Sequence, residues 1–228
     1  MAPHHNVSAS APVVYTAELI SLRWLSDKTF EVTLTRPDGF QFQAGQSICL
    51  LHGGLERHYS IISAPVDTRI ELCIRHIPDG HLTPVLAGAE TGSQIRFTGP
   101  HGYFTLRPSP RAALFVATGT GIAPFVSMTA GGAAGVHLLH GVRNERDLYY
   151  ADKLRRRVDR YTPCLSEPSS TPMPENAFCG LVTDYIATHL PPSEYDFYLS
   201  GNQKMIRDVT HLVDERFSGS YIFTEIFY

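Results

Sequence analysis

The sequence predicts two domains of different classes: an antiparallel β-barrel over residues 13–108, then an α/β domain with a parallel, Rossmann-like sheet over residues 109–228. Short β-branched and aromatic runs, separated by glycines and prolines, fill the first half and are typical of barrels. In the second half, continuous apolar runs alternate with segments of helical length, which favours a parallel sheet covered on both faces. With 43% hydrophobic residues among 228, the chain has apolar material for both cores. Residues 1–12 are expected to form a flexible tail.

Six strands and one short helix are expected in the barrel. The run Thr29–Thr35 alternates most clearly between apolar and polar side chains. The segment Arg36–Gly39 predicts a turn, because its proline fixes φ and its glycine tolerates positive φ. A short helix fits residues 82–87. The expected strands are Val13–Trp24, Thr29–Thr35, Ser47–Leu51, His58–Ile62, Ile70–His76 and Gln94–Phe97.

The segment Leu106–Arg111, with two prolines and two arginines between apolar runs, is typical of a linker and puts the domain boundary near residue 109. Beyond it, the expected strands are Ala112–Ala117, Val136–His140, Tyr195–Leu199 and Tyr221–Thr224. The expected helices are Ala123–Ala130, Leu148–Val158, Leu181–His189 and Asn202–Phe217. The segment Pro168–Pro174 is rich in serine and proline and predicts a loop.

Charge and hydropathy exclude several classes of function. The net charge of −3 supplies no basic excess for a nucleic-acid backbone. No run of about 18 apolar residues predicts a membrane span, and the first ten residues lack the pattern of a signal peptide. We therefore expect a cytoplasmic protein that binds neither nucleic acid nor membrane.

The cysteines and histidines predict no metal centre. The cysteine spacing fits neither a CxxC pair nor a plant-type iron–sulfur cluster. Four reduced thiols are expected instead, at Cys49, Cys73, Cys164 and Cys179. Since His137 and His140 are three apart in an expected strand, they fall on opposite faces.

The strongest chemical signal is the segment Val116–Phe125, in which an apolar strand ends in a turn with the pattern Gly-x-Gly. Glycines let a ligand approach the backbone closely, and a helix that starts at Pro124 offers free N–H groups to phosphate. An ordinary strand-to-helix turn would carry the same glycines. The strand before the turn and the sheet pattern after it favour a nucleotide site.

Two segments of the barrel add weaker signals. In Arg57–Ser60, the arginine and tyrosine share one strand face, and the histidine and serine share the other. These groups suit a phosphorylated aromatic cofactor, although a tyrosine in a strand is usually part of the core. The segment Gly80–Thr83 offers N–H groups and a hydroxyl to an anion, or caps the short helix.

These three segments, with Gly99–Gly102 and Ser200–Asn202, occur in the order typical of one family. From about Val13 onward, the chain resembles the ferredoxin–NADP reductases, flavoproteins in which an FAD-binding barrel precedes a nicotinamide-nucleotide domain. The resemblance implies that Arg57 pairs with the FAD pyrophosphate. It further implies that Tyr59 lies against the isoalloxazine ring and that Ser60 forms a hydrogen bond near flavin N5.

By the same resemblance, other residues of these segments bind the two nucleotides. Those expected to hold FAD are His58, Gly80, His81, Leu82 and Thr83. Those expected to hold the nicotinamide dinucleotide are Thr118, Gly119, Thr120, Gly121, Gly201 and Asn202.

Two departures from the family pattern affect the expected catalytic set. Ser200 stands where many relatives carry cysteine, and its harder hydroxyl is expected to alter hydride transfer. Relatives end in an aromatic ring that stacks on the flavin, two residues after a glutamate. The spacing from Glu225 matches Phe227, whereas the terminal position matches Tyr228, which we slightly favour. Buried aromatics at a strand end are the alternative. The expected catalytic residues are Ser60, Ser200, Glu225 and Tyr228.

The segment Pro163–Pro168 bears on the choice of coenzyme. NADPH-using relatives often carry Ser-Arg here, whereas this chain has Ser166 and Glu167. A carboxylate accepts a hydrogen bond from a ribose 2′-hydroxyl and repels a 2′-phosphate, so NADH is weakly favoured. Arg143 is expected to reach an adenosine phosphate.

The resemblance implies an FAD-dependent NAD(P)H oxidoreductase that passes electrons to a separate ferredoxin-type iron–sulfur protein or flavodoxin. The acceptor is expected to be another chain, because the cluster cysteines are missing. Alternatives are a free-standing flavin or quinone reductase and a non-catalytic flavin-binding electron-transfer subunit. We expect a monomer.

Overall fold

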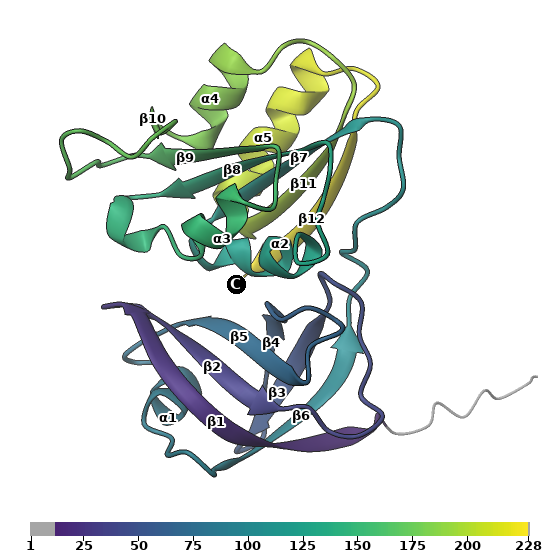
Figure 1. The fold of residues 1–228 in the computed structure, drawn as a ribbon, viewed down its shortest axis with the longest axis vertical. Coiled ribbons are helices and arrows are strands. Elements are labelled where there is room, and N and C mark those ends of the chain that lie inside the picture. Colours follow the sequence, from purple (N-terminus) through teal and green to yellow (C-terminus); the bar gives the residue numbers. More distant parts are fainter. Residues whose placement is uncertain (1–11, 228) are drawn as a thin grey trace, which may run out of the picture.

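The computed structural model of the protein describes residues 12–227, with the backbone alone at Phe227. The chain forms two six-stranded sheets, one in each half. The second half lies against one side of the first (Figure 1). The predicted fold class is therefore confirmed. The tail expected over residues 1–12 lies outside the described residues, apart from Pro12.

The first sheet is entirely antiparallel and has the strand order β4-β3-β6-β1-β2-β5. Its two edge strands come together just beyond β4, where Ile61 forms a bridge with Leu72 of β5. This closure makes the sheet a barrel around an aromatic and aliphatic core. Its elements are β1 (Val14–Ser26), β2 (Thr29–Thr35), β3 (Ser47–His52), β4 (Leu55–Ser60), β5 (Arg69–Arg75), α1 (Thr83–Ala87) and β6 (Gln94–His101).

The second sheet is entirely parallel, with the order β10-β9-β8-β7-β11-β12. Its strands are β7 (Ala112–Thr118), β8 (Val136–Val142), β9 (Arg160–Leu165), β10 (Phe178–Cys179), β11 (Tyr195–Asn202) and β12 (Tyr221–Phe227). Strands β8, β9 and β10 are added on one side of β7, and the later strands β11 and β12 are added on its other side. The end of β7 is thus a topological switch point, where such sheets bind ligands.

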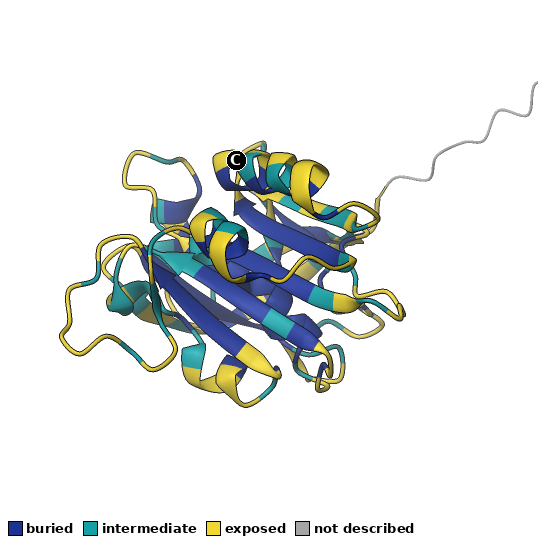
Figure 2. Cartoon of the chain, turned by 90° about the horizontal axis from the view of Figure 1, so that it is seen from above, coloured by how far each residue is buried: buried dark blue, intermediate teal, exposed yellow. Residues whose placement is uncertain are grey.

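Helices cover both faces of this sheet, whose strands are largely buried (Figure 2). The helices α4 (Val182–His189) and α5 (Gln203–Arg216) pack on the face away from the barrel. The short α2 (Ala123–Met128) and α3 (Ala151–Arg155) lie on the face toward it (Figure 1). No described helix has both the length and the apolar run that a membrane crossing needs.

Three elements differ from the sequence-based expectation. Strand β9 was not predicted, because Arg160 and Pro163 are unusual in a buried strand. The two-residue strand β10 was not predicted either. The helix expected over Leu148–Val158 is limited to α3 and preceded by a 3₁₀ turn, η2 (Glu145–Asp147). Tyr150 separates them with a left-handed φ of 61°, which a continuous right-handed helix excludes.

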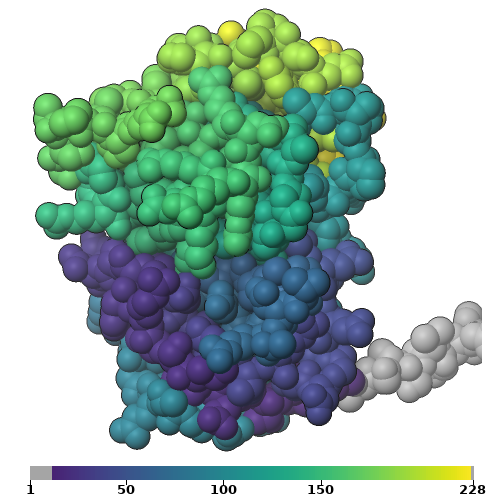
Figure 3. Space-filling view, in the orientation of Figure 1, coloured from purple at the N-terminus to yellow at the C-terminus, as the bar shows by residue number. Residues whose placement is uncertain are grey.

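The two halves share an apolar interface, and their surfaces meet along a broad front (Figure 3). Ile62, Cys73 and Phe104 pack with residues of α2 and the second sheet in one cluster. The Ser127 hydroxyl of α2 donates to the Ser63 carbonyl at 2.7 Å. These contacts fix the second sheet over the barrel.

The segment between the sheets contacts aromatic side chains of β12. The guanidinium of Arg107 lies 4.8 Å from the ring centre of Phe223, and that of Arg111 lies 4.5 Å from the ring centre of Tyr221. Cation–π contacts of this kind hold β12 and the connecting segment together.

Candidate functional site

The candidate site lies where the carboxyl ends of β7, β11 and β12 meet the barrel. In the parallel register, Ser200 of β11 pairs with Ala117 on one side and Glu225 on the other. Ser60, the last residue of β4, donates a hydrogen bond to Oε2 of Glu225 at 3.0 Å. Three of the expected catalytic residues, Ser60, Ser200 and Glu225, are thus brought together from both halves of the chain.

The turn after β7 packs tightly on the end of β11. It continues as the 3₁₀ turn η1 (Gly119–Ile122), which leads into α2. A side chain at Gly121 would collide with the backbone of Ser200 and Gly201, and one at Gly201 would collide with Thr118. The Asn202 N–H also donates to the Thr118 hydroxyl at 2.9 Å. Gly121 and Gly201 are therefore required by this close packing, whereas Gly119 faces open space and has a left-handed φ of 54°.

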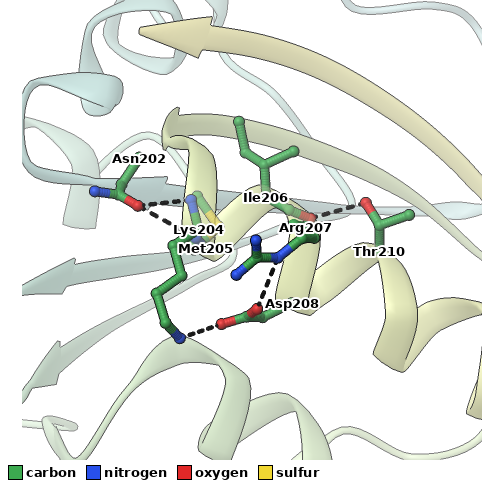
Figure 4. Close-up of polar contacts among 7 residues, drawn as sticks. All are labelled: Asn202, Lys204, Met205, Ile206, Arg207, Asp208 and Thr210. Carbon is green, nitrogen blue, oxygen red and sulfur yellow. Dashed lines mark hydrogen bonds and ion pairs between the residues drawn. The ribbon is translucent and has the colours of Figure 1, made fainter. Parts of the chain in front are cut away.

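Asn202 fixes the start of α5. Its side-chain oxygen accepts hydrogen bonds from the N–H groups of Lys204 at 2.8 Å and Met205 at 3.4 Å (Figure 4). Asparagine is a favoured N-cap because it satisfies N–H groups that the first helical turn leaves unpaired. The side-chain oxygen of Asn202 is thus engaged in capping.

Four buried side-chain atoms of the described residues have no hydrogen-bond partner, and two of them lie toward the carboxyl ends of β8 and β11. They are the Ser200 hydroxyl and Nε2 of His140. Both residues pair in register with Ala117, on opposite sides of β7. Since buried polar groups are normally satisfied, the Ser200 hydroxyl fits a site that a bound group completes.

The electrostatics of Glu225 are unusual for a carboxyl group. Burial raises its pKa to about 7, and the hydrogen bond from Ser60 opposes this shift. Because the charged and neutral forms are then close in free energy near neutral pH, Glu225 can hold or release a proton there.

The expected flavin strand presents different groups on its two faces. Tyr59 packs against the barrel core, and burial raises its pKa to about 12. Arg57 is exposed and donates to the Glu56 carbonyl at 2.8 Å. On the other face, the ring of His58 lies 5.0 Å from that of His101, and desolvation lowers the pKa of His58.

The segment Gly80–Thr83 forms a tight turn before α1. The buried Thr83 hydroxyl accepts from the Ile77 N–H at 2.9 Å and donates to the Ile77 carbonyl at 3.1 Å. This hydroxyl therefore already holds the turn together. Within the described residues, no hydrogen bond or ion pair joins Arg57 to this segment.

The residues expected at the adenosine end lie beyond β8 and β9. The Glu167 N–H donates to the Arg143 carbonyl at 2.8 Å, and the Ser166 N–H donates to the Val142 carbonyl at 3.2 Å. All three expected side chains, those of Arg143, Ser166 and Glu167, are exposed. They follow the carboxyl ends of β8 and β9, which lie on one side of β7 in the sheet.

The expected terminal aromatics lie at the limit of the structure. The backbone of Phe227 pairs with Asn202 in the last position of β12, and Tyr228 is outside the described residues. The choice of stacking ring therefore stays a prediction.

Two features of the site region were not predicted. Tyr149 and Tyr150 donate hydrogen bonds to Thr29 and Glu31 of β2, each at 2.9 Å. The Glu145 carboxylate is bound by two serines of the loop after β9. Paired tyrosines before a charged helix and consecutive serines in a loop were visible in the sequence, but neither pattern indicates its partner.

Comparison with known proteins agrees with this arrangement. Residues 17–106 match the model of the oxidoreductase FAD-binding domain, and residues 115–211 match that of the oxidoreductase NAD-binding domain. Together the two models cover most of the chain.

Two of the proteins that this chain is similar to illustrate the match. Ferredoxin–NADP reductase B of Sorangium cellulosum is 42% identical over 153 residues, which are 61% of this chain and 63% of the relative. The toluate 1,2-dioxygenase electron transfer component of Pseudomonas putida is 33% identical over 215 residues, which are 87% of this chain and 63% of the relative. The chain thus spans less than two thirds of the length of either protein.

A solved ferredoxin NADP⁺ reductase from Neisseria gonorrhoeae, with bound FAD and NADP, shares the fold. Its TM-score is 0.78 at 22% identity, over 94% of this chain and 99% of that one. The molecule is therefore a two-domain oxidoreductase with an FAD-binding domain followed by an NAD-binding domain. The chain belongs to the ferredoxin–NAD(P) reductase family.

Proposed function

We propose that the protein is an FAD-dependent NAD(P)H oxidoreductase that passes electrons to a separate ferredoxin-type iron–sulfur protein or flavodoxin. The observation that carries this proposal is the hydrogen bond between Ser60 and Glu225, which joins the FAD-binding and NAD-binding domains beside Ser200. The names of the relatives, a ferredoxin–NADP reductase and a dioxygenase electron transfer component, support the same reaction class.

The residues present fit FAD and a nicotinamide coenzyme. When bound, FAD supplies a centre that takes up a hydride and releases electrons one at a time. Ser60 orients the flavin at its reacting edge, while Tyr59 offers a ring face and Arg57 a cation for pyrophosphate. His58 and the segment Gly80–Thr83 complete this side, and the segment acts through its backbone because the Thr83 hydroxyl is engaged with Ile77.

On the coenzyme side, the backbone does most of the binding. The turn Thr118–Gly121 holds the dinucleotide at the switch point after β7. Gly201 and Asn202 contact Thr118 and stabilise this turn. Ser200 would offer its unpartnered hydroxyl to the nicotinamide. Arg143, Ser166 and Glu167 hold the adenosine end, beyond β8 and β9.

Glu225 has the proton-handling role. Its pKa near 7 lets it keep or give up a proton at physiological pH. Its hydrogen bond with Ser60 would connect this proton to the flavin edge. The family resemblance assigns the ring that would cover the flavin to Tyr228 or Phe227, whose side chains lie outside the described part of the structure. In the cell we propose a monomer in the cytoplasm.

Spectroscopy and turnover test this function. We expect a yellow protein with one noncovalently bound FAD, and NAD(P)H oxidation that is faster with a ferredoxin and cytochrome c than with free FMN. A purified protein that takes up no FAD, or that oxidises neither NADH nor NADPH with any acceptor, would overturn the proposal.

A further inference from the structure

One carboxylate near the coenzyme site is bound as an anionic ligand would be. Glu145, in η2, accepts hydrogen bonds from the N–H and hydroxyl groups of both Ser169 and Ser170. The hydroxyls donate at 2.6 and 2.7 Å, and the N–H groups at 3.0 to 3.2 Å. Four donor groups from two consecutive residues thus converge on one pair of oxygens. We call this donor set, formed by Ser169 and Ser170, the serine nest.

The serine nest has the chemistry of a phosphate site. Successive backbone N–H groups supplemented by hydroxyls form a concave donor surface that favours anions. The donors also lower the pKa of Glu145 well below its usual range, with the largest effects from Ser169 and Ser170. The nest therefore stabilises negative charge, whichever group carries it.

A chain of contacts connects the serine nest to the turn Thr118–Gly121, which we call the nucleotide turn. Gly141, near the end of β8, packs so closely on Thr118 that an added side chain would contact its methyl group at 3.2 Å. Two residues later, the Arg143 carbonyl accepts the Glu167 N–H at 2.8 Å. The nest begins only two residues beyond Glu167. It consequently borders the end of the site where the adenosine ribose of the coenzyme is proposed to lie.

We propose that Glu145 determines coenzyme specificity: its carboxylate fills an anion site, the serine nest, that would otherwise bind the 2′-phosphate of NADPH. A coenzyme with a free 2′-hydroxyl does not compete for the nest. One with a 2′-phosphate meets the Glu145 and Glu167 carboxylates, and the donors of the serine nest are already occupied by Glu145. This inference rests on the proposed function, since it assigns a substrate preference to the same site.

The test compares two nucleotides that differ only in the 2′-phosphate, 5′-AMP and adenosine 2′,5′-bisphosphate, by titration calorimetry on the full chain. We expect Glu145→Ala to raise the affinity for the bisphosphate about tenfold or more, because charge-assisted hydrogen bonds become available to it. The affinity for 5′-AMP should stay within about twofold. The kcat/KM ratio of NADPH to NADH should rise in parallel.

Two further variants separate the nest from general charge effects. Glu175→Ala removes one exposed acidic side chain from the same loop and should leave both affinities unchanged. Adding Ser169→Ala and Ser170→Ala to the Glu145→Ala variant should abolish the gain, because the hydroxyl donors are then gone. Melting temperatures near that of the wild type show that each variant is folded.

The outcomes distinguish this inference from the proposed function. If Glu145→Ala binds 5′-AMP but gains nothing for the bisphosphate, the specificity role is wrong and the coenzyme site stands. A gain of equal size in Glu175→Ala would also overturn the role of the nest. If neither nucleotide binds any variant or the wild type, the proposed coenzyme site itself fails.

Discussion

Ser60 and Glu225 are 165 positions apart in the sequence, yet one hydrogen bond joins them at the end of the barrel. The carboxyl group is largely removed from water, so its neutral form is favoured up to about pH 7. These two residues supply an oriented hydroxyl and a proton held near neutrality, two properties that the proposed hydride chemistry at a flavin edge would use.

Replacing Ser60 tests its orienting role. We expect Ser60→Ala to slow flavin reduction by NADH about tenfold, because the variant loses a hydrogen bond at the reacting edge but no large binding surface. FAD should stay bound at the wild-type stoichiometry. Stopped-flow absorbance at the flavin band measures the rate, and Ser60→Thr, which keeps the hydroxyl, should recover most of it. Wild-type kinetics in Ser60→Ala would remove Ser60 from the reaction.

The raised pKa of Glu225 predicts a pH dependence of stability. Between the usual carboxyl pKa of 4.5 and about 7, the folded state keeps a proton that the unfolded chain releases. Stability therefore falls as the pH rises through this window, and the loss is complete above pH 7. Urea unfolding of the flavin-free protein at pH 5 and pH 8 measures the change. Glu225→Gln, which has no such proton, should reduce the difference, and an unchanged difference would contradict the assignment.

At the scale of elements, the turn after β7 and the end of β11 act as one unit. Each places its glycine against the backbone of the other, and the Thr118 hydroxyl accepts the Asn202 N–H. Because the sheet is parallel, both ends face the same edge, and the glycines let the two loops approach without side chains between them. The nucleotide turn is consequently supported by the strand that carries Ser200.

A methyl group at this contact should disrupt it. Gly121→Ala places a Cβ against the Ser200 carbonyl and the Gly201 Cα, neither of which is a flexible side-chain end. We expect a loss of about 1–3 kcal/mol in the free energy of unfolding, together with weaker NADH binding. Thermal unfolding and NADH titration measure the two effects. The matched control is Gly131→Ala, where the added methyl meets open space, so a similar loss there would refute the close-packing explanation.

At the scale of the whole molecule, the relative placement of the two domains depends on polar contacts as well as on the shared apolar cluster. The Tyr150 hydroxyl donates to Oε2 of Glu31, whose other oxygen accepts from Arg23 at 3.0 Å. Glu31 is only 8% exposed, so removing a donor leaves a buried carboxylate less satisfied. Tyr150 also holds a left-handed backbone conformation, which persists only where surrounding contacts impose it.

Loss of this hydroxyl should loosen the domain arrangement. We expect Tyr150→Phe to destabilise the protein by about 1–3 kcal/mol, which is roughly 2–4 °C in Tm per kcal/mol for a chain of this size. Hydride transfer from NADH should slow as well, although Tyr150 is not part of the proposed site. Calorimetry and stopped-flow reduction check both effects. Tyr103→Phe, at a side chain 91% exposed, is the control, and equal behaviour of the two variants would contradict the interface role.

The two sheet types follow from the amino-acid sequence alone, because alternating and continuous apolar runs reflect how many faces of a strand are buried. The sequence also located the turn Thr118–Gly121 and the segments that carry Ser60 and Ser200, since each depends on local residue types. It missed β9 and overextended the helix before it, because a strand with Arg160 and Pro163 and a tyrosine with positive φ are imposed by tertiary contacts.

Which of these segments meet depends on the packing of the folded chain. The contacts of Ser60 with Glu225, Tyr150 with Glu31, and Glu145 with the serine nest join residues whose separations, from 24 to 165 positions, carry no local signal. The raised pKa of Glu225 is likewise a consequence of burial between the domains. Local propensity acts over a few residues, whereas burial and pairing depend on the packed chain, so the site's chemistry emerges only when both sheets are in place.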